Sequence, residues 1–425
     1  MMNQKDVVID IRKKLEGAGP PVTKECSIYK VPFDIRKHNE DAYTPKIVSI
    51  GPLHHNTHPR LQNMERHKLI YCNAFLERTQ TSLETWIRYI EEIEPDFRLC
   101  YSDTLEFTKE ELVKIILVDS GFIFELFWKD YHTEWTGSDT FLLIPLIEDT
   151  IALDLLLFEN QLPFHVLDNL FNLSFTTSFG VGGNNAIPSF TELTFSYFSF
   201  YNKPELRFND NSIGICHFTD LIRTFHLQHP PDRRSSRTTD LLKHVPTATE
   251  LSEAGVNFKV VESDCLLDLK FSGGVLHMPL LKVEDRTEVL FRNMVALEQC
   301  FYPEKSYITD YISLLDFLIN TSGDVDTLVQ QGVLVNWTGD TDTVVKLFNS
   351  LGKNITQSNI SSNYCTLSND LNRFYHNICN KLKSTLRRDY CNSPWQTAAT
   401  IAAIVLLILS LIQTVCSVLS VLPEE

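Results

Sequence analysis

The feature that most constrains the fold is an uncharged apolar stretch near the C-terminus, AATIAAIVLLILSLIQTVCSVLSVL, residues 398–422. As a helix, these 25 residues would span about 37 Å, which exceeds the roughly 30 Å hydrocarbon core of a bilayer. A buried helix of a soluble domain is the alternative that composition permits. Gln413 is the one strongly polar side chain, and we expect it to hydrogen-bond within the helix or to a neighbour. We predict a single transmembrane helix over residues 398–422.

Basic residues precede this stretch and predict its orientation. Lys381, Lys383, Arg387 and Arg388 lie shortly before it, and Trp395 stands where an interfacial aromatic residue would. Because positive segments stay on the cytoplasmic side, we expect the bulk of the chain to be cytosolic. The same five residues are candidates for contact with lipid headgroups and the interface. A solvated helix face is the simpler explanation of the basic ones. The expectation is a single-pass, tail-anchored protein, with the plasma membrane as one candidate location.

Composition excludes some classes of partner. The formal charge of −16 argues against a broad nucleic-acid surface, which needs clustered Lys and Arg. The 43% hydrophobic content is ample for a large core. The ten cysteines are scattered without C-x-x-C pairs or zinc-like spacing, which is typical of reduced, buried thiols in the cytosol. We therefore expect a membrane and a protein as partners, no nucleic acid and no cofactor, and leave the oligomeric state open.

Changes of composition divide the chain. A polar N-terminal segment ends in GAGPP and is expected to be flexible. A long helix-rich region follows it. The predicted parts are a flexible segment over residues 1–25, a globular domain over 26–390, an interfacial linker over 391–397, the transmembrane helix over 398–422 and a short tail over 423–425.

Hydrophobic periodicity predicts helices along most of the globular domain. Apolar residues recur at helical spacing over residues 61–94. Thr108 with Glu111 forms a capping box before a helix that is apolar nearly all round. We expect that helix to be interrupted near Gly121, and a later helix to be capped by Asp342.

Residues 257–283 carry a different period. NFKVVE, LLDLKF and GVLHMPLL are partly alternating runs, and Ser272-Gly273-Gly274 between the last two is a hairpin signal. Another short strand is expected around Ile47–Ile50, within an extended segment. The predicted fold class is mainly α with a small antiparallel β element, a helix-dominated α+β fold, with a single C-terminal transmembrane helix.

A polar triplet interrupts the apolar run DLLLFENQLPFHVL. Leu155–Phe158 would occupy four consecutive helical positions, so we expect an enclosed helix there. Pro163 disfavours helix at the preceding residue and suits the first turn of a new helix. Such a break leaves backbone groups unpaired, and Glu159, Asn160 and Gln161 can satisfy them. We predict that the triplet and Pro163 form a structural motif that fixes the angle between two buried helices. A ligand or catalytic site is the alternative.

Metal-ligating patterns are weak. The strongest cluster is HHNTH, with His54, His55 and His58, followed by Glu65 and His67. On an extended segment His54 and His55 would point apart, and no further ligands are evident. We expect solvated or capping roles for these histidines and no metal site.

Catalytic patterns are also weak. The sequence lacks the phosphate-loop, dinucleotide-binding, nucleophile-elbow and zinc-protease motifs. Asp149, Asp154 and Glu159 are spaced by five, which turns each about 140° from the last on a helix. The three carboxylates are therefore not expected to converge, and we predict no catalytic residues.

Eight segments occur in order along the chain: IYKVPFDIRKHNEDAYTPKIVSIGPLHH, LQNMERHKLIYCNAFL, DSGFIFELF, DLLLFENQLPFHVL, ATELSEAGVNFK, FRNMVALEQC, DYISLLDFLI and NSPWQTAATIAAIVLLILSLIQT. Together they resemble a plant family called domain of unknown function 247, from about Cys26 to Ser420. The resemblance implies a large N-terminal globular region, one C-terminal membrane helix and no established catalytic activity. Some grass members are implicated in pollen–stigma self-incompatibility and others in defence or growth. Phe158 and His165 depart from the residues that relatives often carry.

The expected function is that of a non-enzymatic, membrane-anchored plant protein whose acidic helical domain recognises another protein in signalling. Two alternatives stay open at this point. One is an enzyme with an unrecognised site acting near a membrane. A deep pocket with converging titratable groups would favour this alternative. The other is a structural membrane component. An exposed apolar patch would favour the protein-binding function.

Overall fold

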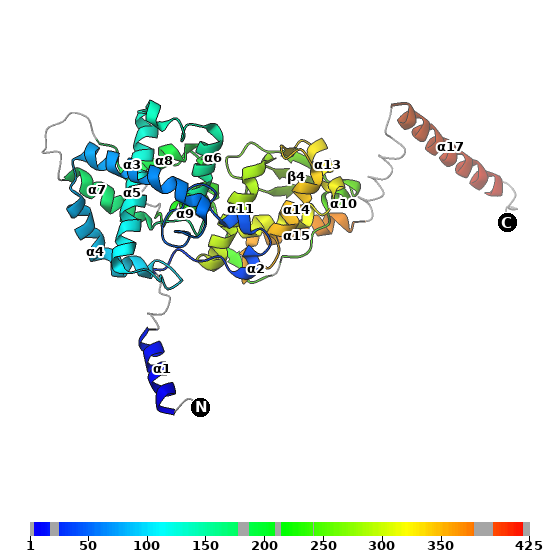
Figure 1. Ribbon diagram of the computed structural model, residues 1–425. Helices are drawn as coiled ribbons and strands as arrows, with labels where there is room; N and C mark the ends of the chain where they lie inside the picture. Colours follow the sequence, from blue (N-terminus) through cyan, green and yellow to red (C-terminus); the bar gives the residue numbers. More distant parts are fainter. Residues whose placement is uncertain are drawn as a thin grey trace.

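The computed structural model describes residues 4–17, 25–176, 187–208, 214–240, 242–377 and 394–419. A helical body lies between two outlying terminal helices, α1 and α17 (Figure 1). The helices are α1 (Gln4–Gly17), α2 (Phe33–Arg36), α3 (Gln62–Thr79), α4 (Leu83–Leu99), α5 (Lys109–His132), α6 (Pro145–Asp154), α7 (Phe164–Thr176), α8 (Phe190–Tyr197), α9 (Phe218–His226), α10 (Ala248–Glu253), α11 (Asp285–Cys300), α12 (Tyr307–Leu318), α13 (Ser322–Gln330), α14 (Thr341–Leu351), α15 (Ser362–Tyr375) and α17 (Pro394–Leu419). The helix-dominated class is thereby confirmed.

The strands are short and form three small sheets. β1 pairs with β7 and β3 with β4 in antiparallel fashion, whereas β2–β4 and β5–β6 are parallel pairs. The predicted hairpin lies at Gly273 and Gly274, whose φ angles are both positive. The strands are β1 (Arg237–Thr238), β2 (Asn257–Val260), β3 (Lys270–Ser272), β4 (Val275–Met278), β5 (Leu281–Val283), β6 (Leu334–Asn336) and β7 (Ile360–Ser361).

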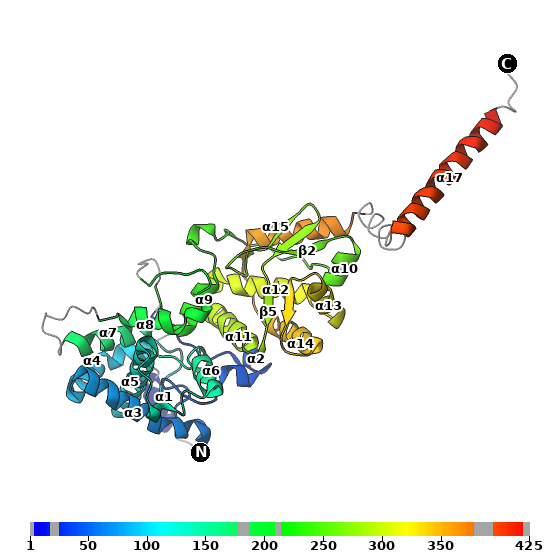
Figure 2. The ribbon, with the colours of Figure 1, turned by 90° about the horizontal axis from the view of Figure 1, so that it is seen from above.

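The small antiparallel β element predicted over residues 257–283 is present as the β3–β4 hairpin, but β2 and β5 pair in parallel, which the prediction did not include. Alternation shows that a run forms a strand, but it does not show which strand pairs with it. β6 is separated from β5 by α11, α12 and α13, and such a connection permits parallel pairing. Helices α10 to α15 surround the short strands in the second half of the body (Figure 2).

The first half of the body is built around α5. A Cβ atom at Gly121 would lie 2.5 Å from the Sγ atom and 2.8 Å from the Cα atom of Cys72 on α3. The missing side chain thus lets α3 and α5 pack closely. The expected interruption at Gly121 is wrong, because α5 runs unbroken and this glycine serves helix packing.

One of the two predicted helix caps is confirmed and the other is displaced. The Thr108–Glu111 capping box begins α5, with hydrogen bonds of 2.9 and 3.2 Å. α14 differs from the prediction, because its N-cap is Asp340 and Asp342 lies in the first turn. The Asp340 carboxylate accepts the backbone N–H groups of Asp342 and Thr343, so the cap stands two residues earlier.

The two terminal helices expose apolar side chains. α17 contains an apolar span, Ala398–Ser417, which has a mean hydropathy of 2.4 and is not buried against the body, so its length and composition would allow it to cross a membrane. Trp395 is exposed at its start. α1 lies within the segment predicted to be flexible, where Val7, Ile11 and Leu15 recur at helical spacing. Lys381, Lys383, Arg387 and Arg388 lie outside the described residues.

Candidate functional site

The polar triplet lies buried at the end of α6. An extended segment near the N-terminus, residues 26–60, crosses the chain there and is here called the extended N-terminal segment. Glu159, Asn160 and Gln161 each expose at most 2% of their surface. α6 ends at Asp154, so the expectation that Leu155–Phe158 continue a helix is wrong, although all four are buried. The polypeptide turns here, and the backbone groups of those turns need partners.

Gln161 joins the end of α6 to the start of α9. Its Nε2 atom donates to the carbonyl oxygens of Leu155 and Leu157 at 2.7 and 2.8 Å. Its Oε1 atom accepts the N–H group of Phe218, the first residue of α9, at 2.9 Å. The amide therefore satisfies carbonyls left where α6 ends and connects them to α9.

Asn160 holds the extended N-terminal segment. Its Oδ1 atom accepts the N–H group of Ile50 at 2.7 Å. Its Nδ2 atom donates to the carbonyl oxygens of Val48 and Asp154 at 3.0 and 2.9 Å. Every donor and the acceptor of this side chain is therefore bound to backbone.

Asp154 continues this arrangement. Its carboxylate accepts the N–H groups of Lys46, Ile47 and Val48 at 2.9, 2.7 and 2.9 Å. Burial raises the pKa of Asp154 to about 6, against the opposing effect of these three N–H groups. The strand expected at Ile47–Ile50 is absent from this described segment, because side chains rather than a neighbouring strand satisfy its backbone.

Glu159 binds the same segment at three points. Its carboxylate accepts the N–H group of Val31 at 2.7 Å and the Arg36 guanidinium at 2.6 Å. The Nε2 atom of His54 lies 2.9 Å from its Oε2 atom. Burial opposes ionisation, but His54 and Arg36 hold the pKa of the Glu159 carboxyl below its usual range.

Pro163 directly precedes α7. Its carbonyl oxygen accepts the N–H groups of Val166 and Leu167 at 3.0 and 3.3 Å. A proline suits this position because its φ angle is fixed and it has no N–H group to satisfy.

The histidine cluster does not converge. His54 is buried beside Glu159, His55 is half-buried, His58 is exposed and His67 stacks on Phe141. Within the residues that the structure describes, no group of three or more His, Cys, Asp or Glu side chains is placed to hold a metal ion.

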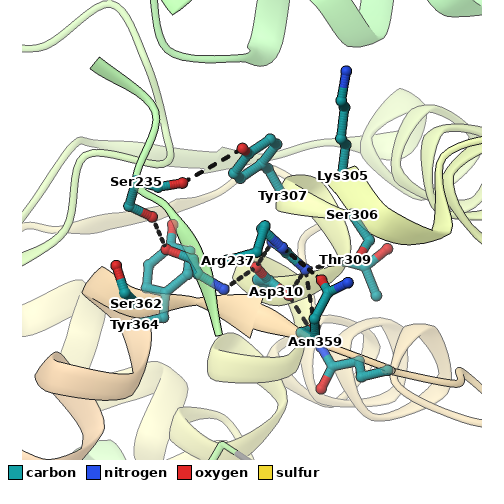
Figure 3. Close-up of polar contacts among 12 residues, drawn as sticks. Ser235, Arg237, Lys305, Ser306, Tyr307, Thr309, Asp310, Asn359, Ser362 and Tyr364 are labelled. Atoms are coloured by element: carbon teal, nitrogen blue, oxygen red, sulfur yellow. Dashed lines mark hydrogen bonds and ion pairs between the residues drawn. The ribbon is translucent and has the colours of Figure 1, made fainter. Parts of the chain in front are cut away.

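A second buried polar network holds α12 against the β1–β7 pair (Figure 3). The Arg237 guanidinium forms an ion pair with Asp310 and donates to Asn359 Oδ1 at 2.6 Å and to Ser306 Oγ at 3.0 Å. Asp310 also accepts the N–H group of Ser361 at 2.9 Å, and burial raises its pKa to about 7. The sequence gives no sign of this network, because its members lie far apart in the chain.

Among the hollows on the described part of the body, two are large. One, of about 1050 Å³, is lined by a mixture of polar, charged and apolar side chains near β3 and α15. Its Asp268 already binds Gln228 and Ser263, and Arg233 lies 3.5 Å from it. The Asp268 carboxylate is therefore already engaged by neighbouring side chains.

The other hollow, of about 870 Å³, is a mainly apolar groove between α3, α4 and α5, here called the three-helix groove. Carboxylates stand at its margin, and Leu69 and Leu83 are 57% and 45% exposed. It is lined by Leu69, Cys72, Asn73, Leu76, Glu77, Gln80, Thr81, Ser82, Leu83, Ile87, Glu91, Glu110, Val113, Lys114, Leu117 and Val118.

This helical body with a long apolar terminal helix belongs to a family of plant proteins of unknown function, DUF247, whose model matches residues 28–409. UPF0481 protein At3g47200 of Arabidopsis thaliana is 26% identical over 441 residues, which cover 97% of this chain and 89% of the relative. Putative UPF0481 protein At3g02645 of the same species is 24% identical over 499 residues, covering 96% and 93%. No solved structure matches the chain.

Proposed function

We propose that the protein is a non-enzymatic, membrane-anchored recognition module whose helical body binds another protein in signalling. The observation that carries the proposal is α17, which presents an uncharged, fully exposed apolar surface long enough for a bilayer. In water such a surface would be costly, whereas in lipid it needs no other cover.

The body supports binding more than catalysis. The polar side chains of the triplet and of the Arg237 network are bonded to their own backbone and to one another. The three-helix groove, by contrast, is open, apolar and edged with charge, as protein-binding surfaces are.

A buried sequon supports a cytosolic body. Asn359 begins an N-x-S sequon, is 8% exposed, and donates from its amide nitrogen to Glu304 Oε2 at 2.5 Å. N-glycosylation in the secretory pathway would attach a bulky sugar to that nitrogen and would be incompatible with this fold. The exposed sequons at Asn172, Asn320 and Asn354 can report orientation experimentally.

Orientation is tested by expressing the full chain in plant cells and treating intact, correctly oriented vesicles with protease. The proposal expects digestion of the body and no mobility shift on removal of N-glycans. Protection of the body, or a shift that is lost in the Asn172→Gln, Asn320→Gln and Asn354→Gln triple variant, would overturn the cytosolic assignment.

Binding is tested by affinity capture from plant membranes with the full chain. The Leu69→Glu and Leu83→Glu double variant places charges in the groove and should lose the captured partner, because buried unpaired charge is costly. Leu146→Glu, at a site on α6 that is 74% exposed, is the matched control and should retain it. A partner retained by both variants, or no reproducible partner, would contradict a recognition function for the groove.

A further inference from the structure

The three-helix groove has the form of a receptor for an amphipathic helix. The part of the groove along α3 runs from Leu69 to Gln80, which corresponds to about 16 Å of helix. Its floor is apolar, and the exposed carboxylates of Glu77, Glu91 and Glu110 outnumber Lys114 at its edge. An occupant would thus present an apolar stripe of similar length with a basic residue beside it.

α1 has these properties. Val7, Val8, Ile11 and Leu15 fall within about 100° of one another around the helix, and each is at least 40% exposed. From Val7 to Leu15 the stripe is about 12 Å long, which fits within the groove. Exposed Arg12 lies next to the stripe, where it would face the carboxylate edge.

Hydrogen bonds hold Ser27 and Ile28, which follow α1 in the chain, near the three-helix groove. The N–H groups of Ser27 and Ile28 donate to the carbonyl oxygen of Cys100 at 3.1 and 3.0 Å. Cys100 ends α4, and Glu91 of the groove lies nine residues back along this helix, about 14 Å away. Residues 18–24 contribute seven residues of chain, which can span up to about 24 Å. The tether is therefore long enough for α1 to reach the groove.

We propose that α1 docks in the three-helix groove of its own chain through Val7, Val8, Ile11 and Leu15. Tethering makes this binding intramolecular, so even weak contacts give high occupancy. A partner that uses the groove must first displace α1, and α1 thereby regulates access. The proposal names an occupant for the groove of the proposed function and is independent of whether α17 spans a membrane.

Photo-crosslinking of the full chain tests this docking. Asn73 lines the groove and is exposed, and its one side-chain hydrogen bond is to Glu77, so a photo-reactive benzoylphenylalanine is tolerable there. After irradiation, mass spectrometry should find an adduct between position 73 and residues of α1 within one chain. The adduct yield should not change on dilution, because the contact is intramolecular.

Charges on the apolar stripe give the decisive comparison. Ile11→Glu with Leu15→Glu should lower the adduct yield about ten-fold or more, since burying charge in the groove is unfavourable. Ile9→Glu, about 145° from the centre of the stripe, is the matched control and should leave the yield unchanged. Equal melting temperatures show that all variants are folded.

Three results would overturn the docking of α1. They are the absence of adducts with α1, equal adduct yields in both variants, and adducts only between chains. Adducts to another protein in place of α1 would leave the groove as a partner site while removing α1 as its occupant.

Discussion

Asn160 shows how one buried amide can replace a missing strand. It pairs one N–H group and two carbonyl oxygens, from Ile50, Val48 and Asp154. The sequence predicts that this residue is buried and bound to backbone, because it interrupts an apolar run. The sequence cannot predict Ile50 or Val48 as partners, because they lie 110 and 112 residues away.

Replacing this amide should destabilise the fold strongly. Asn160→Leu leaves the buried N–H group of Ile50 and carbonyl oxygen of Val48 unpaired, whereas the Asp154 carbonyl oxygen still accepts the N–H group of Leu157. At about 1–3 kcal/mol for each unpaired group, we expect a loss of about 2–6 kcal/mol in the free energy of unfolding. Denaturant unfolding of the full chain in detergent measures it. Asn172→Leu, at an exposed position on α7, is the control and should cost no more than about 0.5 kcal/mol. Equal losses would contradict the role of Asn160.

His217 makes stability depend on pH. Burial lowers its pKa to about 4, and its ring lies within hydrogen-bonding distance of Ser27 O and Asp220 N. As pH falls from about 6.5 to 4, the unfolded chain binds a proton that the folded chain does not, so stability falls by about 1.4 kcal/mol per unit. His217→Gln should remove this slope.

The measurement for His217 is the difference in the free energy of unfolding between the natural protein and the His217→Gln variant at each pH. The raised pKa values of Asp154 and Asp310 act in the opposite direction over an overlapping range, since their folded forms retain protons. They are common to both proteins and cancel in the comparison. If the free energies of unfolding of the two proteins change with pH in the same way from pH 6.5 to pH 4, His217 does not titrate as described.

At the scale of elements, local sequence signals predict well where helices form, but they predict poorly which elements pack beside one another. The capping box at Thr108 and Glu111 and the glycine pair at Gly273 and Gly274 mark elements where they occur. Strand pairing and the length of α5 depend on contacts between distant parts of the chain. Gly121 is an example, because a glycine is needed there to make room for the neighbouring helix α3 and not to interrupt α5 itself.

Adding one methyl group at Gly121 should separate α3 from α5. Gly121→Ala places a Cβ atom in contact with the backbone of Cys72, so we expect a loss of about 1–3 kcal/mol. Gly137→Ala is the matched control, because no atom lies within 4 Å of its Cβ position, and should be within about 0.5 kcal/mol of the natural protein. Thermal unfolding compares the two, and a Gly121→Ala protein as stable as the control would refute close packing.

At the scale of the whole molecule, the extended segment joins both halves of the body. Asn293 on α11 donates to the carbonyl oxygen of Ala42 and accepts the N–H group of Phe158. The same segment binds Glu159 and Asn160 near the end of α6. One apolar core runs through both halves, and α17 stands apart from it with its apolar surface uncovered.

Carbonate extraction of membranes tests the anchoring role of α17 most directly. The full chain and a chain ending before Pro394 are expressed in plant cells, and membranes are washed at high pH. Because α17 is uncharged and long enough to span a bilayer, the full chain should stay in the membrane pellet and the shortened chain should be soluble. Release of the full chain by carbonate would contradict a membrane-spanning α17.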